Sequence, residues 1–308
     1  MEKSRLNQLP LATASILGQP PSILCVGVAT LDIVSELSCW PGEDTEIRAL
    51  DLRQVRGGNA ANTAVVLAGL GGQAVDWMGT LGDDPGAARI VDDLRAGGVG
   101  IEHAVTVSGG VTPTSCVWLN RRRATRTIVH YRDLPELDAS YFSRVDLAPY
   151  AWIHFEGRNV PVLAEMLRRA RDAGARVSLE IEKPREHIES LWPLADVLLF
   201  SRHYALEKGF DSPRALLRHA ARQAPRAALF CAWGEEGAAW QGVDGDSGFV
   251  GATPLARCVD TLGAGDVFNA AVVHGLLRGR APREVIGFAC RLAGRKCAQV
   301  GFEGLRDE

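Results

Sequence analysis

The sequence has no long hydrophobic segment, no strong charge bias and no paired cysteines. None of its apolar runs approaches the roughly 18 residues that a membrane-spanning helix requires. The 34 basic and 37 acidic side chains are mixed along the 308 residues, so no global field favours nucleic acid or an anionic membrane. The seven cysteines include no C-x-x-C pair, which argues against a disulfide framework or a zinc site. We therefore expect a reduced, cytoplasmic protein with no nucleic-acid and no membrane partner.

Two common nucleotide-binding motifs and all internal repeats are also missing. Neither the Walker loop G-x-x-x-x-G-K-[ST] nor the dinucleotide loop G-x-G-x-x-G occurs, which disfavours both of those folds. The hydrophobic content of 46% is sufficient for a sizeable core in one large α/β domain or two ordinary ones. Residues 1–21 faintly imitate a signal peptide, but Pro10 interrupts the apolar part and no small-residue cleavage site follows. These residues are expected to form a flexible tail before a domain over 22–308.

The order of hydrophobic and polar segments is typical of an α/β protein. Ser22 to Thr30 is a short apolar run, the pattern of a strand that is covered on both faces. From residue 152 onward, short strand patterns alternate with helical patterns, at 152–155, 161–173, 176–182, 197–200, 202–208, 212–222 and 227–232. This succession predicts a parallel sheet with covering helices and with polar residues collected at the strand ends.

Two less regular regions, near 36–57 and 105–135, interrupt this alternation. The second contains period-2 strand patterns at 105–107, 114–120 and 125–131. Together the two regions are predicted to form one small β-sheet lid. Three consecutive arginines, Arg121 to Arg123, are expected at a solvated hairpin tip, whereas Arg126 lies inside a strand pattern and is the better ligand candidate.

The most informative stretch is Asp260-Thr261-Leu262-Gly263-Ala264-Gly265-Asp266, which runs directly into a hydrophobic helical pattern over 267–277. A small-residue loop at a helix N-terminus leaves backbone N–H groups unpaired, and these donors favour an anion such as phosphate. Gly263 and Gly265 carry no Cβ, so the backbone can approach a ligand closely. Asp266 is either the N-cap of the helix or a base that takes a proton from a hydroxyl attacking phosphorus.

A second glycine loop, Arg56-Gly57-Gly58-Asn59-Ala60-Ala61-Asn62, opens a second helical pattern. Asn59 and Asn62 are three residues apart, so their side chains lie on one face of the first turn. Capping explains one such asparagine, and two that face the same way suggest hydrogen bonds to a polyhydroxylated ligand. Asp32 follows the first predicted strand, either as a turn residue or at the edge where open α/β sheets bind their ligands.

These two loops resemble the signatures of the ribokinase-like (PfkB) sugar kinases, the second of which reads D-T-x-G-A-G-D. The resemblance covers Ser22 to Leu305, and further strings are similar to those of the ketohexokinase branch. Those strings are Trp152 to Asn159, Glu182 to Glu186, Cys231 to Gly237 and Gly301 to Gly304. The family implies a three-layer α/β/α sandwich with a mostly parallel central sheet and a small β-sheet lid. It also implies a homodimer formed through the lids.

The resemblance implies roles for individual residues in transferring the γ-phosphoryl group of ATP to a sugar hydroxyl. Asp266 would be the general base, and Gly263, Ala264 and Gly265 would form the anion hole. The sugar would contact Asp32, Asp44, Gly58, Asn59, Asn62 and Arg126. The nucleotide would contact Lys183, Gly234, Glu235, Gly237, Thr253, Pro254 and Cys290. ATP and Mg²⁺ are the implied cofactors, K⁺ is left open, and the metal-binding residues are unassigned.

The strings of the ketohexokinase branch favour D-fructose as the acceptor, with fructose 1-phosphate as the product. A kinase of the same fold for ribose, a nucleoside or 2-keto-3-deoxygluconate is the nearest alternative, because pocket shape decides the acceptor. A sugar-binding sensor that has lost turnover is a third interpretation, and the intact Asp266 with its Gly-Ala-Gly loop argues against it.

Overall fold

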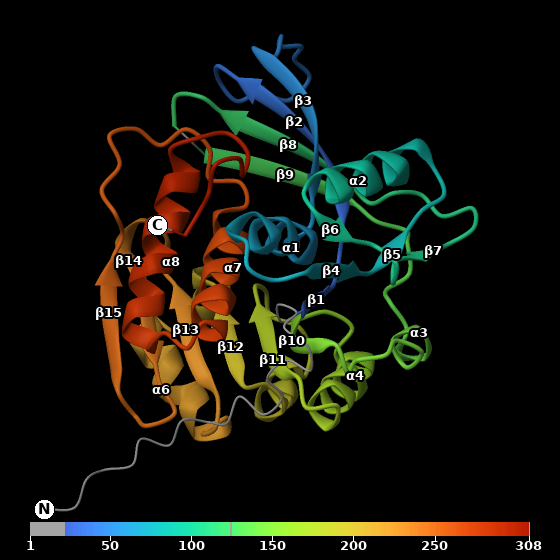
Figure 1. Ribbon diagram of the computed structural model, residues 1–308. Helices are drawn as coiled ribbons and strands as arrows, with labels where there is room; N and C mark the ends of the chain where they lie inside the picture. The colour runs from blue at the N-terminus through green and yellow to red at the C-terminus, as the bar shows by residue number, and fades with distance from the viewer. Residues whose placement is uncertain (1–21, 124, 308) are drawn as a thin grey trace, which may run out of the picture.

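The computed structural model describes residues 22–123 and 125–307, so the predicted flexible tail over 1–21 lies outside the described residues. Figure 1 shows a large twisted sheet with helices on both of its faces and a smaller sheet beyond one end. The predicted three-layer α/β/α sandwich with a mostly parallel central sheet is therefore confirmed. None of the helices in the described part combines the length and hydrophobicity needed to cross a bilayer.

The central sheet has nine strands, in the spatial order β15-β14-β13-β12-β11-β10-β1-β4-β6. Their bounds are β1 (Ser22–Val26), β4 (Val75–Met78), β6 (Val99–Gly100), β10 (Tyr150–Glu156), β11 (Arg176–Ile181), β12 (Val197–Phe200), β13 (Ala228–Ala232), β14 (Gly237–Gln241) and β15 (Ser247–Gly251). The strands from β13 to β6 are parallel, and β14 with β15 adds an antiparallel hairpin at one edge. Because parallel strands end at the same edge, the loops that follow them gather there.

Helices cover both faces of the sheet, and their bounds are α1 (Asn59–Leu70), α2 (Pro85–Ala96), α3 (Ala139–Phe142), α4 (Val160–Asp172), α5 (Arg202–Glu207), α6 (Pro213–Gln223), α7 (Ala264–Leu277) and α8 (Pro282–Cys297). The described residues also form two 3₁₀ helices, η1 (Ile188–Leu194) and η2 (Gly234–Glu236). Helices α1, α2, α7 and α8 share one hydrophobic core with the sheet, and the remaining α-helices with η1 share the other.

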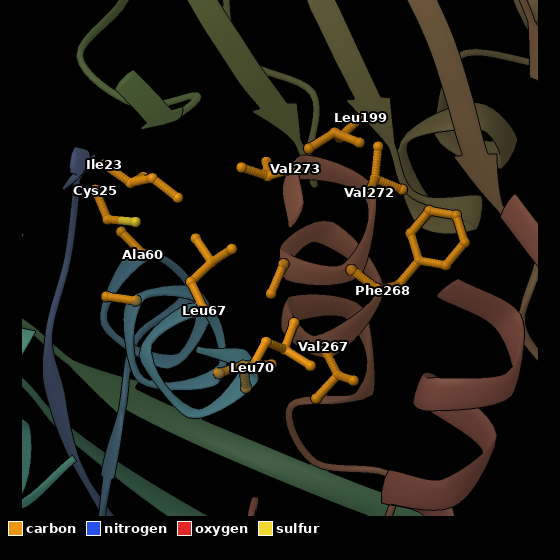
Figure 2. Close-up of a cluster of buried hydrophobic side chains, with 14 of the residues drawn as sticks. Ile23, Cys25, Ala60, Leu67, Leu70, Leu199, Val267, Phe268, Val272 and Val273 are labelled. Carbon is orange, nitrogen blue, oxygen red and sulfur yellow. The ribbon is translucent and has the colours of Figure 1, made fainter. Parts of the chain in front are cut away.

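Strand β1 shows how the two cores are divided. Ile23 and Cys25 point into the first core, whereas Leu24 and Val26 point into the second, as the period of two in a strand requires. In Figure 2, side chains of α1 and α7 point toward one another beneath the strands. Helix α7 is buried on nearly all sides over residues 266–276, so its first turn is fixed firmly against the sheet and against α1.

The small sheet consists of β2 (Thr30–Leu37), β3 (Asp51–Gly57), β8 (Thr114–Asn120) and β9 (Thr125–Tyr131), in the order β3-β2-β8-β9. Strands β2 and β8 are parallel, and the two outer pairs are antiparallel. The predicted strand at 105–107 is not part of it, because β7 (Val105–Thr106) pairs with β5 (Thr80–Leu81) in a separate two-stranded sheet.

The structure also corrects the position of Asp32. The apolar run from Ser22 to Thr30 is continuous in sequence, but β1 ends at Val26. The backbone N–H of Val28 donates to the Glu156 carboxylate over 2.9 Å, so the chain leaves the central sheet here. Asp32 is therefore the third residue of β2 in the small sheet, and it does not stand at the end of a central strand.

Candidate active site

Asp266 is the third residue of α7, and Gly263 occupies the N-cap position with a φ of 80°. Since the cap position belongs to Gly263, the interpretation of Asp266 as an N-cap is wrong. The backbone N–H groups of Gly265 and Asp266 belong to the first helical turn, which offers them no acceptor within the helix. They lie beside the buried Asp266 carboxylate, which is only 7% exposed. The start of α7 thus combines anion-binding donors with a potential base.

The two glycine loops meet at this carboxylate. The Asn62 side-chain amide, in the first turn of α1, donates to Asp266 over 2.6 Å. The Asn62 carbonyl oxygen accepts in turn from the guanidinium of Arg56. Arg56 is buried and forms an ion pair with Asp93 of α2. Asn62 therefore orients Asp266, and Arg56 fixes the orientation of Asn62.

The surroundings of Asp266 raise its pKa well above the ordinary range. Burial is the main cause, and the charges of Glu182 and Glu156 act in the same direction. The hydrogen bond from Asn62 and the charge of Arg56 oppose the rise. A carboxylate with a raised pKa holds a proton more tightly, which is the property that a general base for a sugar hydroxyl needs.

A second buried carboxyl group, that of Glu180 in β11, lies near Asp266. Its Oε1 accepts hydrogen bonds from the amides of Asn59, at 3.1 Å, and Asn269, at 2.9 Å. Its Oε2 is buried without a hydrogen-bond partner among the described residues. Burial and then the charge of Asp266 raise the pKa of Glu180 well above its usual value. Glu180 thereby links the first turn of α1 to the second turn of α7, and its Oε2 stays available to a ligand.

The inner face of the small sheet touches the loop before α7. Arg126 of β9 donates to the hydroxyl of Thr261 over 2.7 Å, and Arg53 of β3 lies 3.4 Å from the carboxylate of Asp260. Leu262 packs against a small apolar cluster that Val34 and its neighbours form within the sheet. The predicted sugar ligand Arg126 thus lies at the site. Its guanidinium contacts the loop that precedes α7, residues 260–265, which we call the motif loop.

The other predicted sugar residues fall into two groups. Asp32 is buried, accepts from the hydroxyl of Thr30 over 2.8 Å, and has a pKa that burial raises. Gly58 adopts a φ of 95°, and a Cβ there would lie 2.2 Å from the carbonyl oxygen of Val28. Asp44, in contrast, is exposed in the connection from β2 to β3, with a φ of 58°. Asp32 and Gly58 therefore lie in the packed part of the site, and Asp44 lies at its periphery.

Most of the predicted nucleotide residues gather at the antiparallel edge of the sheet. Gly234 and Glu235 form the turn after β13, and Gly237 opens β14 opposite Gly251 of β15. A Cβ at Gly294 of α8 would meet the Cβ of Thr253 at 3.3 Å. Pro254 directly follows Thr253, and Cys290 lies one turn before Gly294 on the same helix. Lys183, in contrast, follows β11, where its ammonium group lies 3.6 Å from the Glu182 carboxylate.

Several residues at the site were not assigned a role from the sequence alone. Arg56 stands inside the glycine-loop motif at 56–62, and its ion pair with Asp93 could not be predicted from that motif. From the sequence, Glu180 is only one of three candidates near the phosphates, together with Glu182 and Lys183, although a charged residue in an otherwise apolar strand pattern is a usable signal. Lys296 of α8 gave no local signal, and Phe302 lies in the Gly301 to Gly304 string without an assigned role, because the contacts of both are with residues distant in sequence.

An open α/β sheet with a glycine-rich helix N-terminus at the carboxyl edge of its strands is the architecture of enzymes that handle phosphorylated ligands. Residues 21–304 match the model of the pfkB family carbohydrate kinases, and the chain belongs to this family. It is an ATP-dependent carbohydrate kinase, as the sequence predicted.

The relatives of the chain cover nearly its full length. Ketohexokinase from Mus musculus is 41% identical over 293 residues, which are 92% of this chain and 98% of that protein. The structure of adenosine kinase from Sinorhizobium meliloti matches with a TM-score of 0.78 at 22% identity, over 94% of this chain and 97% of that one. Ribokinase from Arabidopsis thaliana, complexed with ribose and ATP, matches with a TM-score of 0.75 at 22% identity, over 94% and 96% of the two chains.

Proposed function

We propose that this kinase transfers the γ-phosphoryl group of ATP to a ketose, and that the acceptor is the 1-hydroxyl group of D-fructose. The choice of acceptor is supported by the 41% identity to mouse ketohexokinase. The observation that carries the chemistry is the buried Asp266 carboxylate, held by Asn62 at the N-terminus of α7.

In this mechanism Asp266 takes the proton from the sugar hydroxyl group. The hydroxyl oxygen forms a bond to the γ-phosphorus while the bond from that phosphorus to the β–γ bridging oxygen breaks, and the electron pair leaves with ADP. The backbone donors at Gly263, Ala264 and Gly265 stabilise the charge of the transferring group. Most of the rate enhancement in such a site comes from positioning and charge stabilisation. The N–H of Ala264 also contacts the Thr261 carbonyl oxygen at 3.3 Å, so Gly265 offers the freer donor.

The residues at the site fit a magnesium ion that ATP itself holds. Among the described residues, no cluster of three or more His, Cys, Asp or Glu side chains could hold a metal ion alone. Mg²⁺ commonly keeps several waters and binds substrate phosphates with few protein ligands. The free Oε2 of Glu180 and the carboxylate of Glu182 would hold such waters. When bound, Mg²⁺ neutralises charge between the phosphates. A requirement for K⁺ and a cytoplasmic location stay predictions.

The experiment that tests this function is ADP release from MgATP with a panel of acceptors. The panel contains D-fructose, D-ribose, D-tagatose, adenosine and fructose 6-phosphate, and NMR identifies the phosphorylated carbon of each product. Turnover on fructose at the 1-hydroxyl group supports the proposal. Turnover on another acceptor alone keeps the kinase chemistry and contradicts the choice of fructose.

Ribose or a nucleoside is the second candidate acceptor. It is favoured by the weaker similarity to ribokinase from Bacillus subtilis, at 24% identity, and to nucleoside kinase from Methanothermobacter thermautotrophicus, at 23% identity. The same panel separates these acceptors from fructose.

We further propose that two copies pair through the outer face of the small sheet, the face turned away from the motif loop. This outer face carries exposed apolar side chains from three strands, namely Leu52, Cys116, Trp118, Val129 and Tyr131. Leu52, Val129 and Tyr131 are each about three-fifths exposed. An exposed apolar patch on a sheet is a common interface feature, and pairing would remove it from water.

A further inference from the structure

Lys296, in the last turn of α8, is one of the most deeply buried charged residues described in this protein, with 1% of its surface exposed. Its ammonium nitrogen lies 3.0 Å from the carbonyl oxygen of Asp260, 3.3 Å from the carboxylate of the same residue and 3.4 Å from the carbonyl oxygen of Gln299. Buried lysines are rare unless they are paired, because the desolvation of an ammonium ion is costly. Lys296 has no part in the proton abstraction or in the binding of the transferring phosphoryl group as proposed above.

Two of these three contacts are with Asp260, the first residue of the motif loop. Asp260 is 4% exposed, and its Oδ1 accepts from the backbone N–H of Leu262 over 2.9 Å. The N–H of Asp260 donates to the carbonyl oxygen of Cys297 over 3.2 Å. The end of α8 thus holds Asp260 by its backbone and by its side chain, three residues before Gly263.

Phe302 provides a second contact between the C-terminal segment and the loop. A Cβ at Gly263 would lie 2.5 Å from the Cζ of Phe302, so the ring packs directly against the residue that caps α7. The ammonium group of Lys296 lies 5.8 Å from the centre of the same ring, and the guanidinium of Arg56 lies 5.9 Å from it. The ring therefore touches both cations and the glycine of the anion hole, a geometry in which cation–π attraction holds the parts together.

We propose that Lys296 and Phe302 are positioning residues for phosphoryl transfer, which hold the Gly263 loop in the conformation that binds the transferring phosphoryl group. The inference rests on the proposed function, since it assigns the start of α7 to the transition state. Lys296 fixes the loop from the side of Asp260, and Phe302 fixes the left-handed turn at Gly263. Neither side chain touches the sugar or the nucleotide in this role.

This role predicts a particular kinetic signature. A loop that is displaced by a fraction of an ångström still admits ATP and sugar, but its donors no longer match the transition state. Removing the ammonium group should therefore lower kcat and leave both KM values nearly unchanged. A purely structural role would instead lower the amount of folded enzyme and leave the kcat of the folded fraction intact.

The test compares Lys296→Met, Lys296→Arg and Phe302→Leu with Arg283→Met, a control that removes an exposed charge from the first turn of the same helix. For Lys296→Met and Phe302→Leu we expect kcat to fall about tenfold to a hundredfold, with KM values within about threefold of the wild type. Lys296→Arg should lose less, and Arg283→Met should match the wild type. Binding of MgADP with aluminium fluoride and sugar, a mimic of the transferring phosphoryl group, should weaken by the same factor as kcat.

A double variant, Asp260→Asn with Lys296→Met, separates positioning from charge balance, because it removes both charges of the buried pair. The double variant should keep a kcat well below that of the wild type if Lys296 positions the loop. Recovery of wild-type kcat in the double variant would overturn the proposal, as would an unchanged kcat in both Lys296→Met and Phe302→Leu. If Lys296→Met does not fold, Phe302→Leu and the double variant decide the question. A wild type that phosphorylates none of the acceptors would contradict the proposed function instead.

Discussion

The side-chain amide of Asn62 donates a 2.6 Å hydrogen bond to the carboxylate of Asp266, although 204 residues separate them. This bond joins the two glycine loops into one site, because each residue lies in the first turn of its helix. Helices α1 and α7 pack against each other over the central sheet, so the bond spans two rigid elements. A donor on a rigid helix fixes both the orientation and the proton affinity of the carboxylate.

Replacing Asp266 by Asn should nearly abolish turnover. The amide keeps the size of the side chain but cannot take a proton from the acceptor hydroxyl, and general-base catalysis is worth about 10²- to 10⁴-fold. We expect kcat to fall by about that factor while the affinities for ATP and sugar stay within a few-fold, as measured by steady-state kinetics and calorimetry. A variant whose kcat is within a few-fold of the wild type would show that Asp266 is not the base.

The same substitution should stabilise the fold at neutral pH. The raised pKa means that the folded protein binds the Asp266 proton more tightly than the unfolded chain does. The stability of the wild type therefore falls as pH rises from the ordinary aspartate pKa, about 3.9, through the folded pKa. We expect Asp266→Asn to have the higher Tm at pH 7, with the difference shrinking toward pH 4. Equal melting temperatures at both pH values would contradict this expectation.

Removing the Asn62 amide should shift the acid limb of the pH–rate profile. The hydrogen bond from Asn62 lowers the pKa of Asp266, so its loss in Asn62→Ala raises that pKa further. The base is then protonated at higher pH, and the acid limb of kcat moves upward in pH. The profile of kcat at saturating sugar separates this effect from lost sugar affinity. An acid limb that stays in place would mean that another group controls it.

The predictable parts of this structure are those whose signal is local. Asp266 with its glycine loop could be placed at a helix N-terminus because the loop and the helix are consecutive in sequence. Asp32 was misplaced, because the apolar run from Ser22 to Thr30 gives no sign that the chain changes sheets at Gly27. What redirects it is Glu156, which binds the Val28 N–H from 128 residues away. The contacts of Lys296 and Glu180 could not be predicted for the same reason, because their partners are distant in sequence.

Gly57 should be required for the position of Asp32. A Cβ at Gly57 would lie 2.2 Å from the Asp32 carboxylate, so Gly57→Ala must displace that side chain from its buried site. Because only the end of a side chain has to move, the variant should fold, and the KM for sugar should rise by about tenfold or more as a sugar hydrogen bond is lost. The KM for ATP should not change.

The matched control for this variant is Gly69→Ala in α1, where a Cβ would meet nothing within 4 Å. It should retain wild-type kinetics and gain roughly 0.5–1 kcal/mol of helix stability. If Gly57→Ala binds sugar as the wild type does, Asp32 does not contact the sugar. The measurement is steady-state kinetics with each substrate varied in turn, together with thermal unfolding of both variants.

The outer face of the small sheet offers the test of the proposed homodimer. Val129 is 59% exposed there, next to Cys116 on the neighbouring strand. Placing a charge at its centre with Val129→Glu should dissociate the pair, because an unpaired carboxylate would be buried in an apolar interface. Leu206→Glu is the control, since Leu206 is similarly exposed on α5, which belongs to the opposite core. Sedimentation velocity should show a dimer for the wild type and for the control, and a monomer for Val129→Glu. The affinity for sugar should fall only in the monomeric variant, because its small sheet loses the support of the partner copy. A monomeric wild type, or a dimer that survives Val129→Glu, would rule out pairing through this face.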